Sequence, residues 1–161
     1  MPSLSILLID DDDSQREVLS GFMKKNNYKV SSYANGEKGL EAVKNNYVDL
    51  VITDFKMPGI DGLEVLEKVK RINPEIAVMI ITAFGTIEDS VHAMKKGAWD
   101  YLSKPIDLDE LKFKLEKLNQ YKNLLQENEN LRSRLSDESI ESDIVYKSSE
   151  MEEVINMIAR V

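Results

Sequence analysis

Short apolar runs alternate with amphipathic stretches along the first two thirds of the chain. The runs have the length of β-strands, and the stretches between them repeat apolar residues at i, i+3 and i+4, as helices do. Strands that alternate with single helices form βαβ units, which build a parallel sheet with helices on both faces. The pattern therefore predicts an α/β fold with a doubly wound, five-stranded parallel sheet, whose strands lie at SILLI (5–9), YKVSSY (28–33), DLVIT (49–53), IAVMIIT (76–82) and WDYL (99–102).

The residues best suited to chemistry follow the ends of these predicted strands. Four consecutive aspartates (10–13) come after the first strand, and Asp54 comes after the third. Thr82 ends the fourth strand, and Lys104 follows the fifth. In an open parallel sheet, ligands bind at the edge formed by the carboxyl ends of the strands. We therefore expect these residues to converge on one site.

The run of aspartates has a structural and a chemical interpretation. Structurally, it starts a helix whose dipole favours carboxylates, with Asp13 or Ser14 as the N-cap and with Asp12 also expected to cap. Chemically, two carboxylates about 5 Å apart repel by roughly 3 kcal/mol at an effective dielectric constant of about 20. Asp10 and Asp11 facing Asp54 would therefore need a cation. Oxygen ligands favour a hard ion, and Mg²⁺, which keeps several waters, fits an open edge better than Ca²⁺.

A phosphoryl group is the ligand that such a site would hold. Beside a bound metal, Lys104 and the Thr82 hydroxyl would cradle its oxygens, and a cis peptide bond before Pro105 would fix the direction of the lysine. Asp54 is the natural nucleophile, because a carboxylate needs no deprotonation before it attacks. The arrangement predicts phosphoryl transfer onto Asp54.

Composition and charge narrow the range of partners. The net charge of −8 argues against a nucleic-acid-binding surface, because phosphate contacts need clustered lysine and arginine. The absence of cysteine excludes disulfides and thiolate metal sites. The sequence has neither an N-terminal leader pattern nor an apolar run that approaches a membrane span, so we expect a cytoplasmic protein that binds no membrane.

Several short motifs resemble those of a known family, the receiver domain of two-component response regulators. They are DDD after the first strand, DFKMPGIDG (54–62), ITA (81–83) and DYLSKP (100–105), within a resemblance that covers residues 4 to about 118. The resemblance implies the flavodoxin-like receiver fold and a histidine kinase as phosphate donor. It implies a phosphoacceptor signalling domain, not an enzyme with a substrate of its own, in which Asp54 is the phosphoacceptor.

The same resemblance assigns the metal ligands. Asp11 would bind Mg²⁺ directly and Asp10 through water, while Asp54 and the main-chain carbonyl of Lys56 complete the set. The register of the acidic run also allows Asp12 in the pair. We place the pair at 10 and 11 because Arg16 then falls where the family often has an arginine.

Two further residues resemble the switch pair of the family. The Thr82 hydroxyl would move to the phosphoryl group, and the Tyr101 ring would turn inward behind it. The alternative for Tyr101 is an ordinary residue of an amphipathic strand.

Other classes of protein place phosphate chemistry on a similar sheet. Haloacid-dehalogenase-like phosphatases use a strand-end aspartate but need a second acid two residues later, where this chain has Lys56. Flavodoxins hold phosphate in a Ser/Thr/Gly loop after the first strand, where four aspartates would repel it. A stand-alone binding module and a small phosphatase stay open as alternatives.

From Asp107 to about Leu135, no glycine or proline interrupts a strongly helical stretch. Asp107 and Glu110 have the spacing of a capping box at its start. One stripe within it recurs at spacings of three and four, as the seam of a coiled coil does, although it could also pack on the receiver itself. We expect the last receiver helix to continue as an extended C-terminal coiled-coil helix over 107–135 and to form a homodimer, through a seam of Tyr121, Leu124, Asn128, Leu131 and Leu135.

The end of the chain differs from the helix before it in composition. Residues 136–143 are polar and acidic and indicate a linker, after which IVYKSSEM (144–151) resembles the entry into the AAA+ ATPase domain of sigma-54-dependent activators of the nitrogen-regulation and dicarboxylate-transport type. The resemblance implies a receiver domain (1–118), the helix (107–135), and a linker with the truncated start of an AAA+ domain (136–161). DNA and sigma-54 RNA polymerase would be contacted only through domains absent from this chain.

Overall fold

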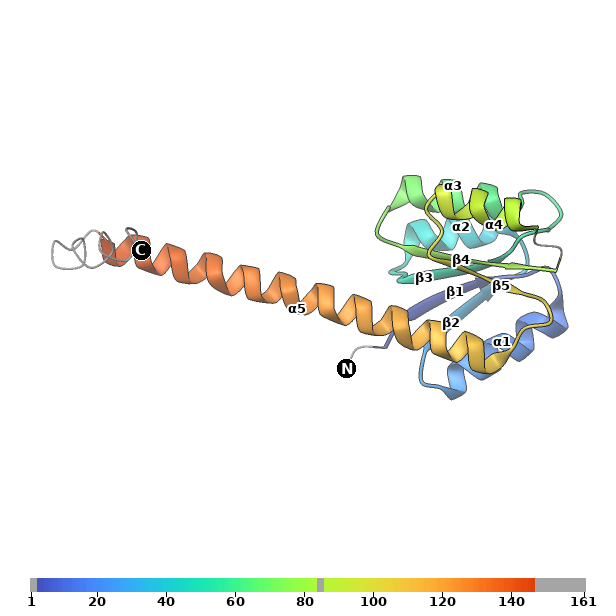
Figure 1. The fold of residues 1–161 in the computed structure, drawn as a ribbon, viewed down its shortest axis with the longest axis horizontal. Helices are drawn as coiled ribbons and strands as arrows, with labels where there is room; N and C mark the ends of the chain where they lie inside the picture. Colours follow the sequence, from blue (N-terminus) through green and yellow to red (C-terminus); the bar gives the residue numbers. More distant parts are fainter. Residues whose placement is uncertain (1–2, 84–85, 147–161) are drawn as a thin grey trace. The chain divides into compact units, whose positions relative to one another are not determined.

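A computed structural model describes residues 3–83 and 86–146, with side chains up to residue 137. Strands and helices alternate along the chain (Figure 1). They are β1 (Ser5–Ile9), α1 (Asp13–Lys25), β2 (Lys29–Tyr33), α2 (Gly36–Asn45), β3 (Leu50–Asp54), α3 (Gly62–Ile72), β4 (Ala77–Thr82), α4 (Ile87–Lys95), β5 (Asp100–Ser103) and α5 (Leu108–Tyr146).

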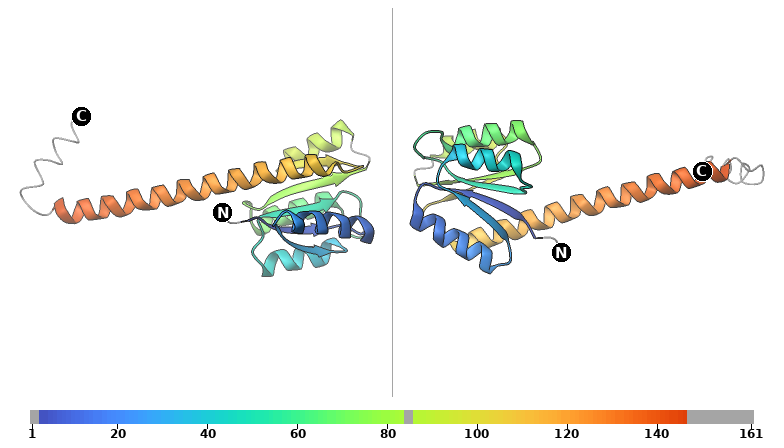
Figure 2. Two further views of the ribbon diagram at one scale, coloured as in Figure 1. Left: turned by 90° about the horizontal axis from the view of Figure 1, so that it is seen from below. Right: turned by 180° about the vertical axis from the view of Figure 1, so that it is seen from behind.

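The five strands form one parallel sheet in the order β2-β1-β3-β4-β5. Helices α2, α3 and α4 cover one face, and α1 with the start of α5 covers the other (Figure 1, Figure 2). The predicted doubly wound α/β fold with a five-stranded parallel sheet is therefore confirmed. Each strand begins within one residue of its predicted position.

The inner strands are apolar because they are buried on both faces. In β1, Leu7 and Ile9 enter the core under α2 and α3, while Ile6 and Leu8 enter the core under α1 and α5. Strands β3 and β4 are buried along their whole length, whereas β2 is partly exposed at the sheet edge. This is the burial expected for central and edge strands of a parallel sheet.

Helix α3 starts unusually close to the end of β3. A Cβ added to Gly62 would lie 2.5 Å from the main-chain oxygen of Asp54 and 2.9 Å from Cα of Phe55. The Gly62 N–H donates to the Phe55 carbonyl at 2.8 Å, and the Asp61 side chain caps the helix by accepting from Glu64 N–H. The missing side chain of Gly62 therefore allows the helix to fix the loop that follows Asp54.

Helix α5 contributes to two compact units, Met1–Asn119 and Gln120–Val161. In the first unit, Leu111, Leu115 and Leu118 are buried in the core. Asp107 accepts from the main-chain N–H groups of Asp109 and Glu110, as expected of a residue that caps this helix.

The second unit differs from the sequence-based expectation in where the helix ends. It continues to Tyr146 through the segment 136–143, for which the sequence predicts a linker outside the helix. That segment is polar but contains no glycine or proline to stop a helix. Most of the predicted AAA+ start, from residue 147 on, lies outside the described residues. Among the described residues, no helix is both long enough and apolar enough to cross a membrane.

The close approach at Gly62 yields a stability prediction. Gly62→Ala should lower the free energy of unfolding by about 1–3 kcal/mol, because the new methyl group meets main-chain atoms that must shift. Gly21→Ala is the matched control. Nothing lies within 4 Å of the position that its methyl group would take, so alanine should stabilise α1 by about 0.5–1 kcal/mol. Urea unfolding of both variants tests this, and a Gly62→Ala protein as stable as wild type would contradict it.

Candidate functional site

Three carboxylates meet at the carboxyl edge of the sheet. Strands β1 and β3 are neighbours with Ile9 level with Thr53, so the next residues, Asp10 and Asp54, stand side by side. One oxygen from each of Asp10, Asp11 and Asp54 lies within 4.8 Å of the others. Asp10 and Asp54 are buried, whereas Asp11 is exposed. The structure therefore brings together the carboxylates that the sequence singled out.

The environment of Asp10 suits a cation. Its Oδ1 accepts from the main-chain N–H of Asp12 at 2.9 Å, but its buried Oδ2 has no hydrogen-bond partner among the described residues. Burial raises the pKa of Asp10, the hydrogen bond from Asp12 opposes this, and the charge of Asp54 raises it further. A buried carboxylate oxygen without a donor is costly. A bound Mg²⁺ would offset this cost, so the donor set fits the predicted metal.

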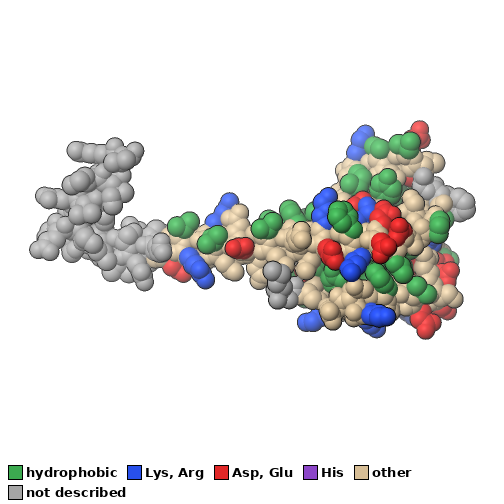
Figure 3. All heavy atoms as spheres, turned by 60° about the horizontal axis from the view of Figure 1, so that its bottom comes forward, with side chains coloured by type: hydrophobic (Ala, Val, Ile, Leu, Met, Phe, Trp, Pro, Cys, Tyr) green, Lys and Arg blue, Asp and Glu red, His purple; other side chains and the backbone are tan. Residues whose placement is uncertain are grey.

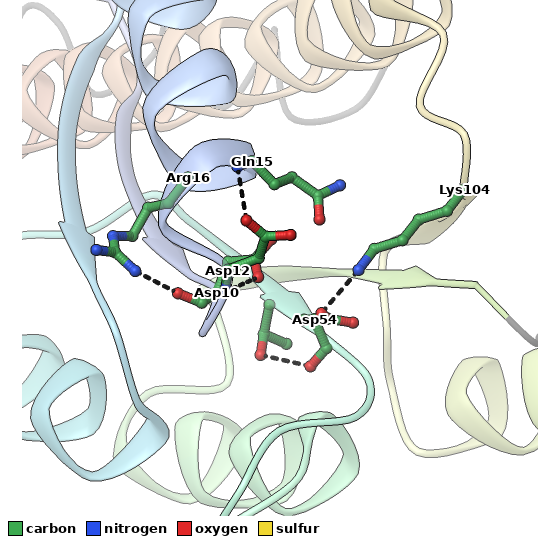
Figure 4. Close-up of polar contacts among 7 residues, drawn as sticks. Asp10, Asp12, Gln15, Arg16, Asp54 and Lys104 are labelled. Carbon is green, nitrogen blue, oxygen red and sulfur yellow. Dashed lines mark hydrogen bonds and ion pairs between the residues drawn. The ribbon is translucent and has the colours of Figure 1, made fainter.

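The neighbouring aspartates have structural roles (Figure 4). Among the residues expected to cap α1, Asp12 is the N-cap, and its side chain accepts from the Gln15 N–H at 3.2 Å. Arg16 donates to the main-chain oxygen of Asp10 at 2.7 Å and pairs with Asp13 at 2.5 Å. The Asp12 side chain thus caps the helix, and the three carboxylates that come together are those of Asp10, Asp11 and Asp54.

Lys104 contacts the cluster from the opposite side (Figure 4). Its Nζ lies 2.8 Å from Oδ2 of Asp54, and its main-chain N–H donates to the Thr82 carbonyl at 2.8 Å. The Lys104–Pro105 peptide bond is cis. Burial lowers the pKa of Lys104, but the hydrogen bond to Asp54 and the charges of Asp54, Asp10 and Asp11 outweigh it, so the pKa is raised. Lys104 is therefore a charged partner for Asp54.

The remaining predicted residues surround this centre. Thr82 ends β4 beside Ser103 of β5 and is buried. Tyr101 lies in β5 and is 39% exposed. Lys56 lies in the loop between β3 and α3, two residues after Asp54, and its main-chain carbonyl stays a predicted ligand. The sheet thus gathers every predicted side chain at or near one edge.

The profile of the response regulator receiver domain matches residues 6–116. The chain belongs to this family. The resemblance seen in the motifs is therefore confirmed. Members of this family are phosphoacceptor signalling domains of two-component systems.

Relatives and solved structures agree with this assignment. The transcriptional regulatory protein ZraR of Escherichia coli (strain K12) is 40% identical over 115 residues, which cover 71% of this chain and 26% of ZraR. The C4-dicarboxylate transport transcriptional regulatory protein DctD of Rhizobium meliloti (strain 1021) is 31% identical over 128 residues, which cover 80% and 28%. This chain spans about a quarter of the length of these relatives.

A receiver domain protein from Clostridium thermocellum has the same fold. Its crystal structure is 32% identical in sequence, with a TM-score of 0.72, and the match covers 76% of this chain and 98% of that chain. The described receiver fold is therefore that of the family.

One residue near the site was missed by the sequence analysis. Lys114 of α5 pairs with Asp100 of β5 at 2.7 Å. Its sequence signal is the spacing of four from Glu110, which indicates a pair within the helix. The contact with β5 depends on how the helix packs on the sheet, so no local pattern could have revealed it.

The crowding of carboxylates yields a prediction for Asp10→Asn. In chelator, the variant should be more stable than wild type because one buried charge is removed. In millimolar Mg²⁺, wild type should gain stability and the variant should gain much less, because metal binding stabilises only a folded site. Asp12→Asn is the control, since it removes a charge from the same run while keeping a good N-cap. A wild-type free energy of unfolding that does not change with Mg²⁺ would contradict the proposed metal site.

The stability gained by Asp10→Asn should also depend on pH with a definite sign. The pKa of Asp10 is raised in the folded protein, so ionising it costs folding free energy above that raised pKa. The cost fades as the pH falls through the raised pKa towards the ordinary value. The gain should be largest at neutral pH and shrink in acid, as measured by urea unfolding in chelator. A gain that grows in acid would refute this assignment.

Proposed function

We propose that this chain is a phosphorylation-controlled receiver that accepts a phosphoryl group from a histidine kinase on Asp54 in a Mg²⁺-dependent reaction. The observation that carries the proposal is the single site at which the Asp54 carboxylate meets two further carboxylates and the Lys104 ammonium. A phosphoryl acceptor needs this combination of a nucleophile, a metal-holding set and a cation.

The chemistry follows from these groups. A carboxylate oxygen of Asp54 attacks phosphorus in line and forms an O–P bond, while the P–N bond to the kinase histidine breaks. Asp10, Asp11, Asp54 and the Lys56 carbonyl would hold Mg²⁺, which supplies positive charge for the phosphoryl oxygens. Lys104, already 2.8 Å from Asp54, pairs with one of these oxygens and keeps the new acyl phosphate at the sheet edge.

The switch proposal concerns Thr82 and Tyr101. Thr82 lies at the end of β4, the strand next to β3, which supports a role in which its hydroxyl would donate to a phosphoryl group on Asp54. The Tyr101 ring, on the adjacent strand β5, would then turn inward towards the space behind Thr82. Phosphorylation would thus be converted into a change of surface on α4 and β5.

The proposal for how the signal leaves the receiver rests on helix α5 and on the names of the relatives. ZraR and DctD are named transcriptional regulatory proteins, which supports a role in transcription for the whole protein. We infer a receiver domain over 1–118, a dimerising helix over 107–135, and a segment over 136–161 that leads into a sigma-54 activator AAA+ ATPase domain. Phosphorylation would change the arrangement of two receivers and so regulate the ATPase domain.

The seam proposed for dimerisation is exposed in the single chain. Hydrophobic side chains recur between charged ones along the described part of α5 (Figure 3). Those at the seam positions, Tyr121, Leu124, Leu131 and Leu135, are all exposed. Burying a leucine side chain is worth roughly 1.5–3 kcal/mol, so a partner helix would stabilise this stripe.

Phosphoryl transfer predicts one covalent modification. Acetyl phosphate with Mg²⁺ should add one phosphate to wild type, seen by intact mass, that is stable in acid and labile in base. Asp54→Asn should remain unmodified because the nucleophile is lost. Asp61→Asn, which keeps the cap of α3, is the control and should be labelled like wild type. Equal labelling of Asp54→Asn would refute the assignment.

Dimerisation through α5 predicts a position-specific effect. Leu124→Glu combined with Leu131→Glu should convert a micromolar dimer into monomer in sedimentation, because both charges fall in the seam. Gln126→Glu, on the outer side of the same helix, should leave the dimer intact. Asn128→Leu should stabilise the assembly and loosen its register, since a seam asparagine favours one alignment at a cost in stability. A dimer that survives both seam charges would place the interface elsewhere.

A further inference from the structure

Lys114 connects α5 to the edge strand β5 beside Tyr101. Its Nζ lies 2.7 Å from Oδ2 of Asp100, 3.7 Å from Oε1 of Glu110 and 5.9 Å from the centre of the Tyr101 ring. The Lys114 side chain is only 17% exposed. The ammonium group is therefore held at a defined place next to the ring, although the proposed phosphoryl chemistry does not use it.

Asp100 joins this lysine to the backbone of Tyr101. One carboxylate oxygen, Oδ1, accepts from the Tyr101 N–H at 2.8 Å, and the other accepts from Lys114. A single carboxylate thus orients both the strand at Tyr101 and the cation that faces its ring.

The Tyr101 ring lies along the outer strand β5, away from the centre of the sheet face to which it belongs. Leu102 enters the core under α1 and α5, so Tyr101 and Ser103 belong to the opposite face, which α4 covers. On that face, Tyr101 lines a cavity of about 500 Å³ together with Val91 and Met94. The ring is nevertheless within cation–π range of a lysine from the helix on the other face. It therefore occupies an outward position, with space beside it towards α4.

We propose that Lys114 is a positioning residue that holds the Tyr101 ring outward and thereby lowers the population of the switched state. The inference rests on the proposed role of Tyr101, whose ring turns inward when Asp54 is phosphorylated. An inward ring leaves the Lys114 ammonium, so this contact is made in the resting state alone. A contact made in one of two states biases the equilibrium towards that state by its own free energy.

The size of the bias sets the expected effect. The Tyr101 ring is 39% exposed, and a cation–π contact at an exposed ring corresponds to a population ratio of about two- to five-fold. A ligand that binds only the switched state gains apparent affinity in proportion to the population of that state. Removing the contact should therefore tighten the binding of a phosphoryl mimic without any change at the site itself.

Calorimetric titration with beryllofluoride and Mg²⁺ tests this. Lys114→Gln removes the cation and should raise the affinity about two- to five-fold. Lys114→Arg keeps a cation and should restore the wild-type affinity. Lys112→Gln is the matched control, because it removes the same charge from an exposed position on the other side of α5. It should bind like wild type.

A double-mutant cycle separates positioning from a merely structural role. In a Tyr101→Ala background, Lys114→Gln should no longer change the affinity, because the ring that it positions is gone. An affinity gain that persists without the ring, or Lys114→Gln binding like wild type, would overturn the inference while leaving the phosphoacceptor function intact.

The resting protein offers a readout that needs no phosphoryl mimic. In protein labelled with 3-fluorotyrosine, the Tyr101 fluorine signal, assigned by its loss in Tyr101→Phe, should show less solvent exposure in Lys114→Gln than in wild type. Unchanged exposure overturns the inference. Absence of beryllofluoride binding by wild type would instead overturn the proposed function, and the fluorine signal would still decide whether Lys114 holds the ring.

Discussion

Mutual repulsion among the carboxylates of Asp10, Asp11 and Asp54 is the constraint on which this site depends. Their oxygens lie within 4.8 Å of one another, and two of the three residues are buried. Lys104 offsets part of the charge through Asp54, but Oδ2 of Asp10 keeps no donor among the described residues. The folded chain therefore holds in place a negative charge that the proposed Mg²⁺ would neutralise before a phosphoryl group binds.

The sheet supplies the rigidity that such crowding requires. Asp10 and Asp54 stand at the ends of adjacent strands that are buried on both faces. The two residues cannot separate without disturbing the hydrophobic core on each face of the sheet. Because Gly62 has no side chain, α3 can start directly against the end of β3, which fixes the loop that carries Lys56. Side chains mounted on rigid elements keep their geometry better than those on loops. The costly arrangement thus persists because the surrounding packing is stronger than the local repulsion.

The sequence was most informative where burial dictates composition. The strands and the convergence of Asp54, Thr82 and Lys104 at one edge followed from apolar runs and parallel topology. The N-cap stayed open among Asp12, Asp13 and Ser14, because four identical aspartates offer no contrast by which to choose among them, and the structure selects Asp12. The end of α5 was misplaced because polarity alone does not stop a helix. Lys114 was missed because its partners come from another element.

Helix α5 is the element on which the proposed output depends. Leu118 is buried in the receiver core, whereas Tyr121, one turn later, is 46% exposed. The same uninterrupted helix also carries Lys114, which meets Asp100 and the Tyr101 ring at the sheet edge. One element therefore satisfies two separate demands, a core that fixes its first turns and an apolar stripe that lacks cover in the single chain. The proposed function assigns the switch to Tyr101 and dimerisation to the stripe, so α5 is the element that would have to couple the two.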